Sequence, residues 1–178
     1  MKEDKSRVYV QVLTEEIDQL LMHHGFLSIA GTESIGDSRC NRWTRNNGWK
    51  TDAVLFYFSN RHVDSVDPHV QVLLPLPQDM TPGFDDRNVR KLAGHDISPY
   101  YFPKIAGTII MFRCRAFVEE VVRDTERCLP WFDETSTPEK CLARLERGEA
   151  MCAPGSPRYE SVKAYLSSLL KPLQQHRD

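Results

Sequence analysis

The sequence predicts an α+β domain: an antiparallel sheet of about four strands, packed with an N-terminal helix and with C-terminal helices. Two observations support this class. Apolar residues recur at helical spacing near both ends of the chain, whereas the segments between them have strand lengths and strand patterns. The loops that join these segments are about ten residues long, which suits antiparallel neighbours better than parallel crossovers.

The first helix is predicted over residues 8–24, followed by Gly25 and Phe26. Gly25 supplies the left-handed conformation that ends a helix without steric cost. Phe26 is then placed to pack back on the helix end. The apolar stripe of this helix consists of Val10, Leu13, Ile17, Leu20, Leu21 and His24.

Four segments are strand candidates. Residues 39–45 are polar and alternating, which is typical of an edge strand, and Asn46-Asn47-Gly48 is a turn signal. Residues 53–59 are apolar on both faces, as in a covered central strand. Residues 70–74 alternate and end at prolines. Residues 108–112 complete the sheet, although such a short apolar run also fits the start of the next helix.

Residues 76–103 are predicted to be an irregular loop, because prolines and glycines recur through them. Loops of this length inside a compact domain are uncommon and often functional. The expected organisation is therefore one α+β domain over residues 1–178 that carries this loop.

The C-terminal part is predicted to be helical. One stripe spans residues 117–129, with Asp124 among the charged residues assigned to the opposite side, and Pro130 stops this helix. Thr137 and Pro138 form a helix start, and Ser156 opens the last helix. Trp131 lies between a helix stop and a helix start, so we expect it to be buried beneath this corner.

Composition limits the possible functions. The net charge is −2 with Lys and Arg spread along the chain, which disfavours nucleic-acid binding. No apolar run approaches the roughly 20 residues that span a bilayer, and the charged N-terminus is unlike a signal peptide. The five cysteines form no C-x-x-C pair, which disfavours disulfides and thiolate zinc sites. We expect a cytoplasmic protein without a membrane association.

One segment contains residue types that bind metals: His62, Asp64, Asp67 and His69. Imidazole and carboxylate groups suit zinc, iron or manganese. However, the spacing matches no established ligand motif, and Asp-Pro at 67–68 is common in turns. A solvated hairpin loop is the favoured interpretation and a metal site the alternative, so no metal or other cofactor is expected.

Two further residues, His95 and Trp43, could have a functional role in place of a structural one. His95 precedes Asp96, and such a pair could hold a general base, but no nucleophile stands in a recognisable elbow motif. A small metal-dependent or acid–base hydrolase that uses the 62–69 segment or His95 is therefore the alternative function. Trp43 lies between arginines and could stack on nucleic acid, although a structural cross-strand tryptophan is favoured.

The most specific sequence features of the chain are residues 129–133 (LPWFD) and 136–140 (STPEK). They occur together with Leu20, Leu21, Gly25, Phe26, Trp43, Thr44, Arg45, Phe56, Tyr57 and Phe58. With these residues and this order of elements, most of the chain resembles the bacterial family called domain of unknown function 4304. No catalytic residues are established for that family, so the resemblance implies none. Its members resemble in size and style the antidote proteins that accompany bacterial toxins.

The expected function is a non-enzymatic protein-binding domain, of the immunity type that neutralises a bacterial toxin. Nuclease toxins present basic clefts, so an antidote surface should be acidic and should capture its partner by charge steering. The acidic residues of the predicted loop are Asp79, Asp85 and Asp86, and Phe84 is the expected central anchor between them.

Overall fold

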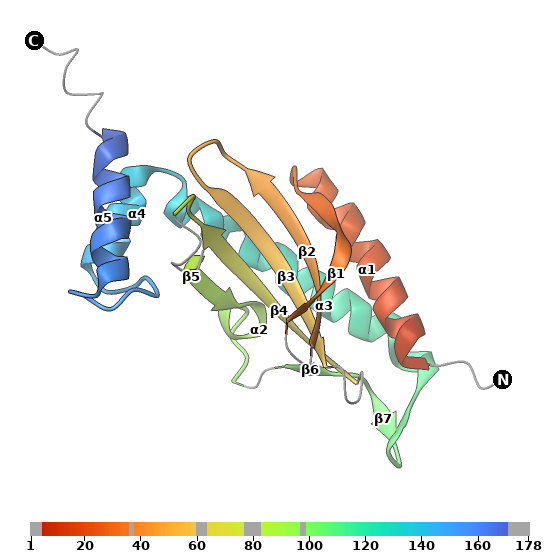
Figure 1. Cartoon of the computed structure of the whole chain (residues 1–178). Coiled ribbons are helices and arrows are strands. Elements are labelled where there is room, and N and C mark those ends of the chain that lie inside the picture. Colours follow the sequence, from red (N-terminus) through yellow and green to blue (C-terminus); the bar gives the residue numbers. More distant parts are fainter. Residues whose placement is uncertain (1–4, 36–37, 60–63, 77–82, 97–98, 171–178) are drawn as a thin grey trace, which may run out of the picture. The chain divides into compact units, whose positions relative to one another are not determined.

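The computed structural model describes residues 5–35, 38–59, 64–76, 83–96 and 99–170 (Figure 1). It confirms the α+β class, with an N-terminal helix, a mostly antiparallel sheet and C-terminal helices. The elements are α1 (Lys5–His23), β1 (Leu27–Ile35), β2 (Ser38–Asn46), β3 (Thr51–Ser59), β4 (Ser65–Leu73), β5 (Gly83–Asn88), α2 (Val89–Leu92), β6 (Tyr100–Tyr101), β7 (Lys104–Ile105), β8 (Thr108–Ile109), the 3-10 helix η1 (Met111–Arg113), α3 (Cys114–Cys128), the 3-10 helix η2 (Leu129–Thr135), α4 (Pro138–Glu146) and α5 (Pro157–Leu170).

The main sheet has the strand order β1-β2-β3-β4-β5, and β6 pairs with β4. β1 and β2 are antiparallel, with Leu27 opposite Thr44 and Ile35 opposite Ser38. The prediction that residues 39–45 form an edge strand is therefore wrong, because the unpredicted strand β1 covers that side of β2. The prediction of a central strand at 53–59 is confirmed as β3.

β4 starts at Ser65, so residues 67–69 lie inside a strand and not in a turn. Asp-Pro pairs are frequent in turns, but Val66 and Val70 on either side are fully buried and extend the apolar face of the strand. The hairpin-loop interpretation is wrong for these residues. β6 pairs antiparallel with the start of β4, where Val66 lies opposite Tyr100.

The predicted irregular loop contains regular structure in its described part. Residues 83–88 form β5, and the short helix α2 follows at once. The Asn88 side chain caps this helix by accepting a hydrogen bond from the Lys91 backbone N–H at 3.1 Å. The prediction of an irregular segment over 76–103 is wrong for these residues.

The fourth predicted strand, residues 108–112, is shorter than expected and does not belong to the main sheet. β8 covers only Thr108–Ile109 and pairs with β7 in a separate two-stranded hairpin. Ala106 and Gly107 both have positive φ (48° and 74°), as a tight two-residue hairpin turn requires. This local turn pairs the segment with its neighbour instead of the main sheet, and Met111 then begins η1.

The chain forms two compact units. One consists of Met1–Arg45, Ala53–Val70 and Arg87–Leu129, and the other of Asn46–Asp52, Gln71–Asp86 and Pro130–Asp178. β3, β4 and β5 each contribute residues to both. Each unit is described by itself below.

In the first unit, α1 and α3 lie side by side against the sheet (Figure 1). Tyr9 is fully buried and its ring packs on those of Phe102 and Phe117, with centroids 4.8 and 5.6 Å apart. Trp43 is 1% exposed, and its indole N–H donates to Asp18 of α1. The structural interpretation of Trp43 is confirmed, and this ring is not available to stack on nucleic acid.

In the second unit, α4 and α5 pack on each other. Thr137 caps α4 by accepting a hydrogen bond from the Lys140 backbone N–H at 3.3 Å, which confirms the predicted start. Trp131 is 7% exposed and lies edge-on to Phe132, with centroids 5.3 Å apart. The predicted burial of Trp131 is confirmed.

Candidate functional site

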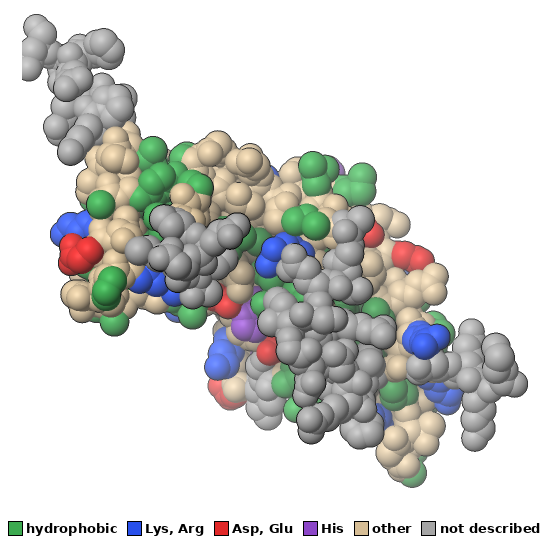
Figure 2. Space-filling view, in the orientation of Figure 1, with side chains coloured by type: hydrophobic (Ala, Val, Ile, Leu, Met, Phe, Trp, Pro, Cys, Tyr) green, Lys and Arg blue, Asp and Glu red, His purple; other side chains and the backbone are tan. Residues whose placement is uncertain are grey.

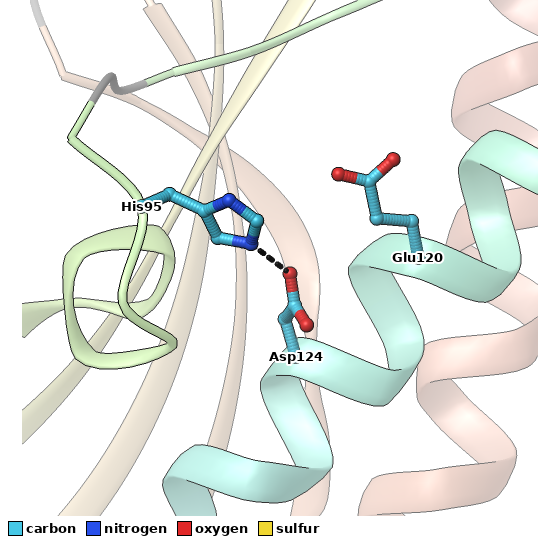
Figure 3. A group of neighbouring side chains, drawn as sticks. All are labelled: His95, Glu120 and Asp124. Carbon is cyan, nitrogen blue, oxygen red and sulfur yellow. Dashed lines mark hydrogen bonds and ion pairs between the residues drawn. The ribbon is translucent and has the colours of Figure 1, made fainter.

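The candidate site with the best-defined geometry consists of His95, Glu120 and Asp124, all in the first unit (Figure 3). Glu120 and Asp124 are four residues apart on α3, so they lie on one face of the helix. His95 follows the end of α2, where Gly94 has a φ of 90°. The His95 backbone N–H donates to the Arg90 carbonyl at 3.0 Å, and this cap turns the chain so that the imidazole meets α3.

Asp124 is a buried carboxylate, 1% exposed, so its assignment to the polar side of the helix was wrong. Its Oδ2 accepts a hydrogen bond from the Tyr100 hydroxyl at 2.9 Å and lies 3.0 Å from His95 Nε2. The exposed side chains of Arg123 and Arg127 lie 3.7 and 3.8 Å from Oδ1. These groups compensate a charge whose burial would otherwise be costly.

Tyr100 is held as a hydrogen-bond donor. Burial, and then the hydrogen bond to Asp124, raises the pKa of the Tyr100 hydroxyl, so the phenol stays protonated. The Arg90 guanidinium lies 4.6 Å from the centre of the ring and donates to the Pro99 carbonyl at 2.9 Å. Tyr100 therefore fixes the position of the Asp124 carboxylate.

His95 is the accessible member of this group, with a side chain that is 36% exposed. It pairs with Asp124 and not with the neighbouring Asp96 that the sequence suggested. A buried carboxylate that holds one imidazole nitrogen can orient a general base, or it can simply fix the loop on the helix. The ligand atoms of His95, Glu120 and Asp124 also lie within 4.8 Å of one another, a distance compatible with a metal ion.

A second candidate site is a groove of about 570 Å³ between α1, η1 and α3, also in the first unit. Val8 and Val12 form one apolar ridge on α1, and residues 118 and 122 form another on α3, because residues four apart share a helix face. The apolar lining consists of Val8, Val12, Met111, Phe112, Val118 and Val122.

The rim of the groove is charged. Arg115 Nε lies 2.8 Å from Glu119 Oε1, and Glu16 belongs to the same lining. The Arg113 guanidinium also lies here, 6.0 Å from the centre of the Phe112 ring, so charges of both signs surround the groove. Phe112 stands in solvent beside it with 77% of its surface exposed. Such a ring in an apolar groove is typical of an interaction surface.

The structure describes three of the four residues of the predicted metal-like segment. His62 lies outside the described residues. Asp64 forms an ion pair with Lys104, and Asp67 Oδ2 lies 3.5 Å from His69 Nε2. Within the part of the chain that the structure describes, the three remaining residues are not among the groups whose ligand atoms converge.

Two of the four residues expected to bind a partner, Phe84 and Asp85, are interior. Asp79 lies outside the described residues. Phe84 and Asp85 are each 1% exposed, and Asp85 Oδ2 lies 2.8 Å from Arg144 Nη2. Asp86 is half-buried. Phe84 and Asp85 therefore do not form the exposed acidic surface that was expected, because β5 directs them into the second unit.

A further buried ion pair lies in the second unit. Lys50 Nζ is 2.6 Å from Asp52 Oδ1, and the two side chains are 2% and 1% exposed. Asn47 donates to the other carboxylate oxygen at 2.7 Å, and Lys50 also contacts the Thr135 hydroxyl at 3.2 Å. The groups satisfy one another, so we assign this cluster a structural role.

All five cysteines are free and buried. Burial raises the pKa of the Cys128 thiol to about 11 and that of Cys141 to about 12. These thiols remain protonated at neutral pH and are poor nucleophiles. Cys128 and Cys141 therefore act as small apolar residues of the interior.

The surface shows no broad basic area among the described residues of the face in Figure 2, where Lys and Arg lie in separate small groups. None of the described helices is long and apolar enough to cross a membrane. Comparison with known proteins gives no match to a family model, a curated protein or a solved structure.

Proposed function

We propose that the chain is a non-enzymatic protein-binding domain that contacts its partner through the α1–α3 groove, and that it neutralises a bacterial toxin. The observation that supports this is the groove itself, in which apolar side chains from two helices surround a space of about 570 Å³. Phe112, 77% exposed, gives that surface a large aromatic ring, the residue type that often dominates binding energy.

The occupant that fits best is an amphipathic helix of the partner protein. Two apolar ridges on neighbouring helices form the kind of groove into which such a helix places residues spaced three and four apart. Charged side chains of both signs, Glu16, Glu119 and Arg115, lie at the rim and could pair with polar residues beside the apolar face of the partner helix.

This proposal moves the interface away from residues 79–86. Phe84 and Asp85 are buried and Asp85 is paired with Arg144, so neither offers a surface to a partner.

Replacement of Phe112 by glutamate should abolish protection against the toxin. The chain is co-expressed with the toxin-like product of the adjacent gene, and growth is measured together with the Kd of the purified pair. Because the ring is 77% exposed, its removal should leave folding intact. Loss of a central aromatic contact should weaken binding by roughly tenfold or more.

Leu27→Glu is the matched control, because Leu27 is 71% exposed and lies at the start of β1, outside the groove lining. This variant should protect as well as the parent. Full protection by Phe112→Glu would mean that the groove is not the interface. If the parent neither protects nor binds the toxin-like product, the immunity role is wrong for that pair.

A further inference from the structure

We propose that His95, Glu120 and Asp124 bind a divalent transition-metal ion such as Zn²⁺. One imidazole and two carboxylates are a ligand set suited to zinc, manganese or iron. The ligand atoms already lie within 4.8 Å of one another. Three protein ligands would leave a coordination position open to water.

The spacing of two of the atoms fits this assignment. His95 Nε2 and Asp124 Oδ2 are 3.0 Å apart. Two atoms each about 2.1 Å from one ion are separated by about 3.0–3.4 Å at angles between about 90° and 109°. An ion can therefore take the place of the hydrogen bond between them when the two side chains turn toward it, and the half-buried Glu120 completes the set by side-chain rotation.

The surroundings orient the ligands. The Tyr100 hydroxyl donates to Asp124 Oδ2 at 2.9 Å, and Arg90 packs on the Tyr100 ring. Outer partners of this kind fix a ligating carboxylate and are a regular part of metal sites. The guanidinium groups of Arg123 and Arg127 would repel a bound metal ion. Both side chains are largely exposed and at least 3.7 Å from Asp124, so solvent screens this repulsion.

The competing explanation is that His95 and Asp124 only brace the loop on α3. A purely structural contact requires the hydrogen bond between His95 and Asp124 and does not require Glu120. A metal site needs all three. Glu120→Gln separates the two explanations, because it retains the brace and removes one ligand.

The experiment uses the full chain without an affinity tag, stripped with chelator and titrated with ZnCl₂ by calorimetry. The parent should bind one equivalent, and saturating Zn²⁺ should raise its Tm by about 5 °C or more. Glu120→Gln should keep the Tm of the metal-free parent and bind Zn²⁺ at least tenfold more weakly. Glu126→Gln, an exposed carboxylate on the same helix, should bind as the parent does.

A second control removes two neighbouring histidines that lie outside the proposed site, His23 and His24. The rings of His23 and His24 have centroids 5.6 Å apart at the end of α1 and can bind Zn²⁺ adventitiously. The His23→Ala, His24→Ala variant should keep the stoichiometric site. The proposal is overturned if the parent binds no stoichiometric Zn²⁺, or if Glu120→Gln binds as tightly as the parent. Neither result bears on the α1–α3 groove.

Discussion

Replacement of Lys50 by methionine should lower the free energy of unfolding by about 3–5 kcal/mol, the usual cost of removing one partner from a buried ion pair. Lys50 and Asp52 are 2% and 1% exposed and their charged atoms are 2.6 Å apart. Methionine retains most of the apolar contact with Phe132, whose ring centre lies 5.9 Å from Lys50 Nζ. The Asp52 carboxylate would lose the ammonium group of Lys50, while the neutral Asn47 amide would still donate to it.

Urea denaturation measures this effect, and two further variants test its cause. Lys50→Met combined with Asp52→Leu should recover most of the loss, because no uncompensated charge remains. Arg115→Met removes one partner of an ion pair that is highly exposed and should leave stability unchanged within error. A small effect of Lys50→Met alone would show that water reaches Asp52.

Replacement of Trp131 by alanine should also cost about 3–5 kcal/mol, the range observed for deletion of a large buried aromatic side chain. Trp131 is 7% exposed, contacts the Phe132 ring and lies beneath the Arg144 guanidinium, which is 5.9 Å from its ring. Its removal leaves a cavity at the corner between η2 and α4.

Phe112→Ala is the matched comparison for the same denaturation measurement. This ring is 77% exposed, so its removal should change the free energy of unfolding by less than about 0.5 kcal/mol. If Trp131→Ala costs less than about 1 kcal/mol, the tryptophan is accessible in solution and becomes a candidate for partner binding.

Elements with strong local signals could be predicted from the sequence. α1 ends just before Gly25, which adopts a φ of 78°, and Thr137 caps the start of α4, because both caps depend on a few adjacent residues. β1 and β5 were missed because a polar or glycine-containing strand depends on its neighbours in the sheet. Asp85 in β5 is an example: its burial depends on Arg144, 59 positions away in the chain.

The candidate site was partly visible in the sequence. Asp124 falls between Val121 and Cys128 at the three- and four-residue spacing of the buried face of α3, and that spacing signalled an interior carboxylate. Its partner His95 could not be identified this way, because their contact joins two segments across a loop. Residue type led us to assign Asp124 to the polar side, whereas periodicity was the better guide.

The buried thiols have a practical consequence for measuring local motion. Cys40, Cys114 and Cys128 belong to one compact unit, whereas Cys141 and Cys152 belong to the other. A disulfide reagent reacts with such thiols only when the surrounding structure opens, and the rate of modification then reports the free energy of that opening. Mass spectrometry of the labelled positions would thus show whether the two units open together or separately.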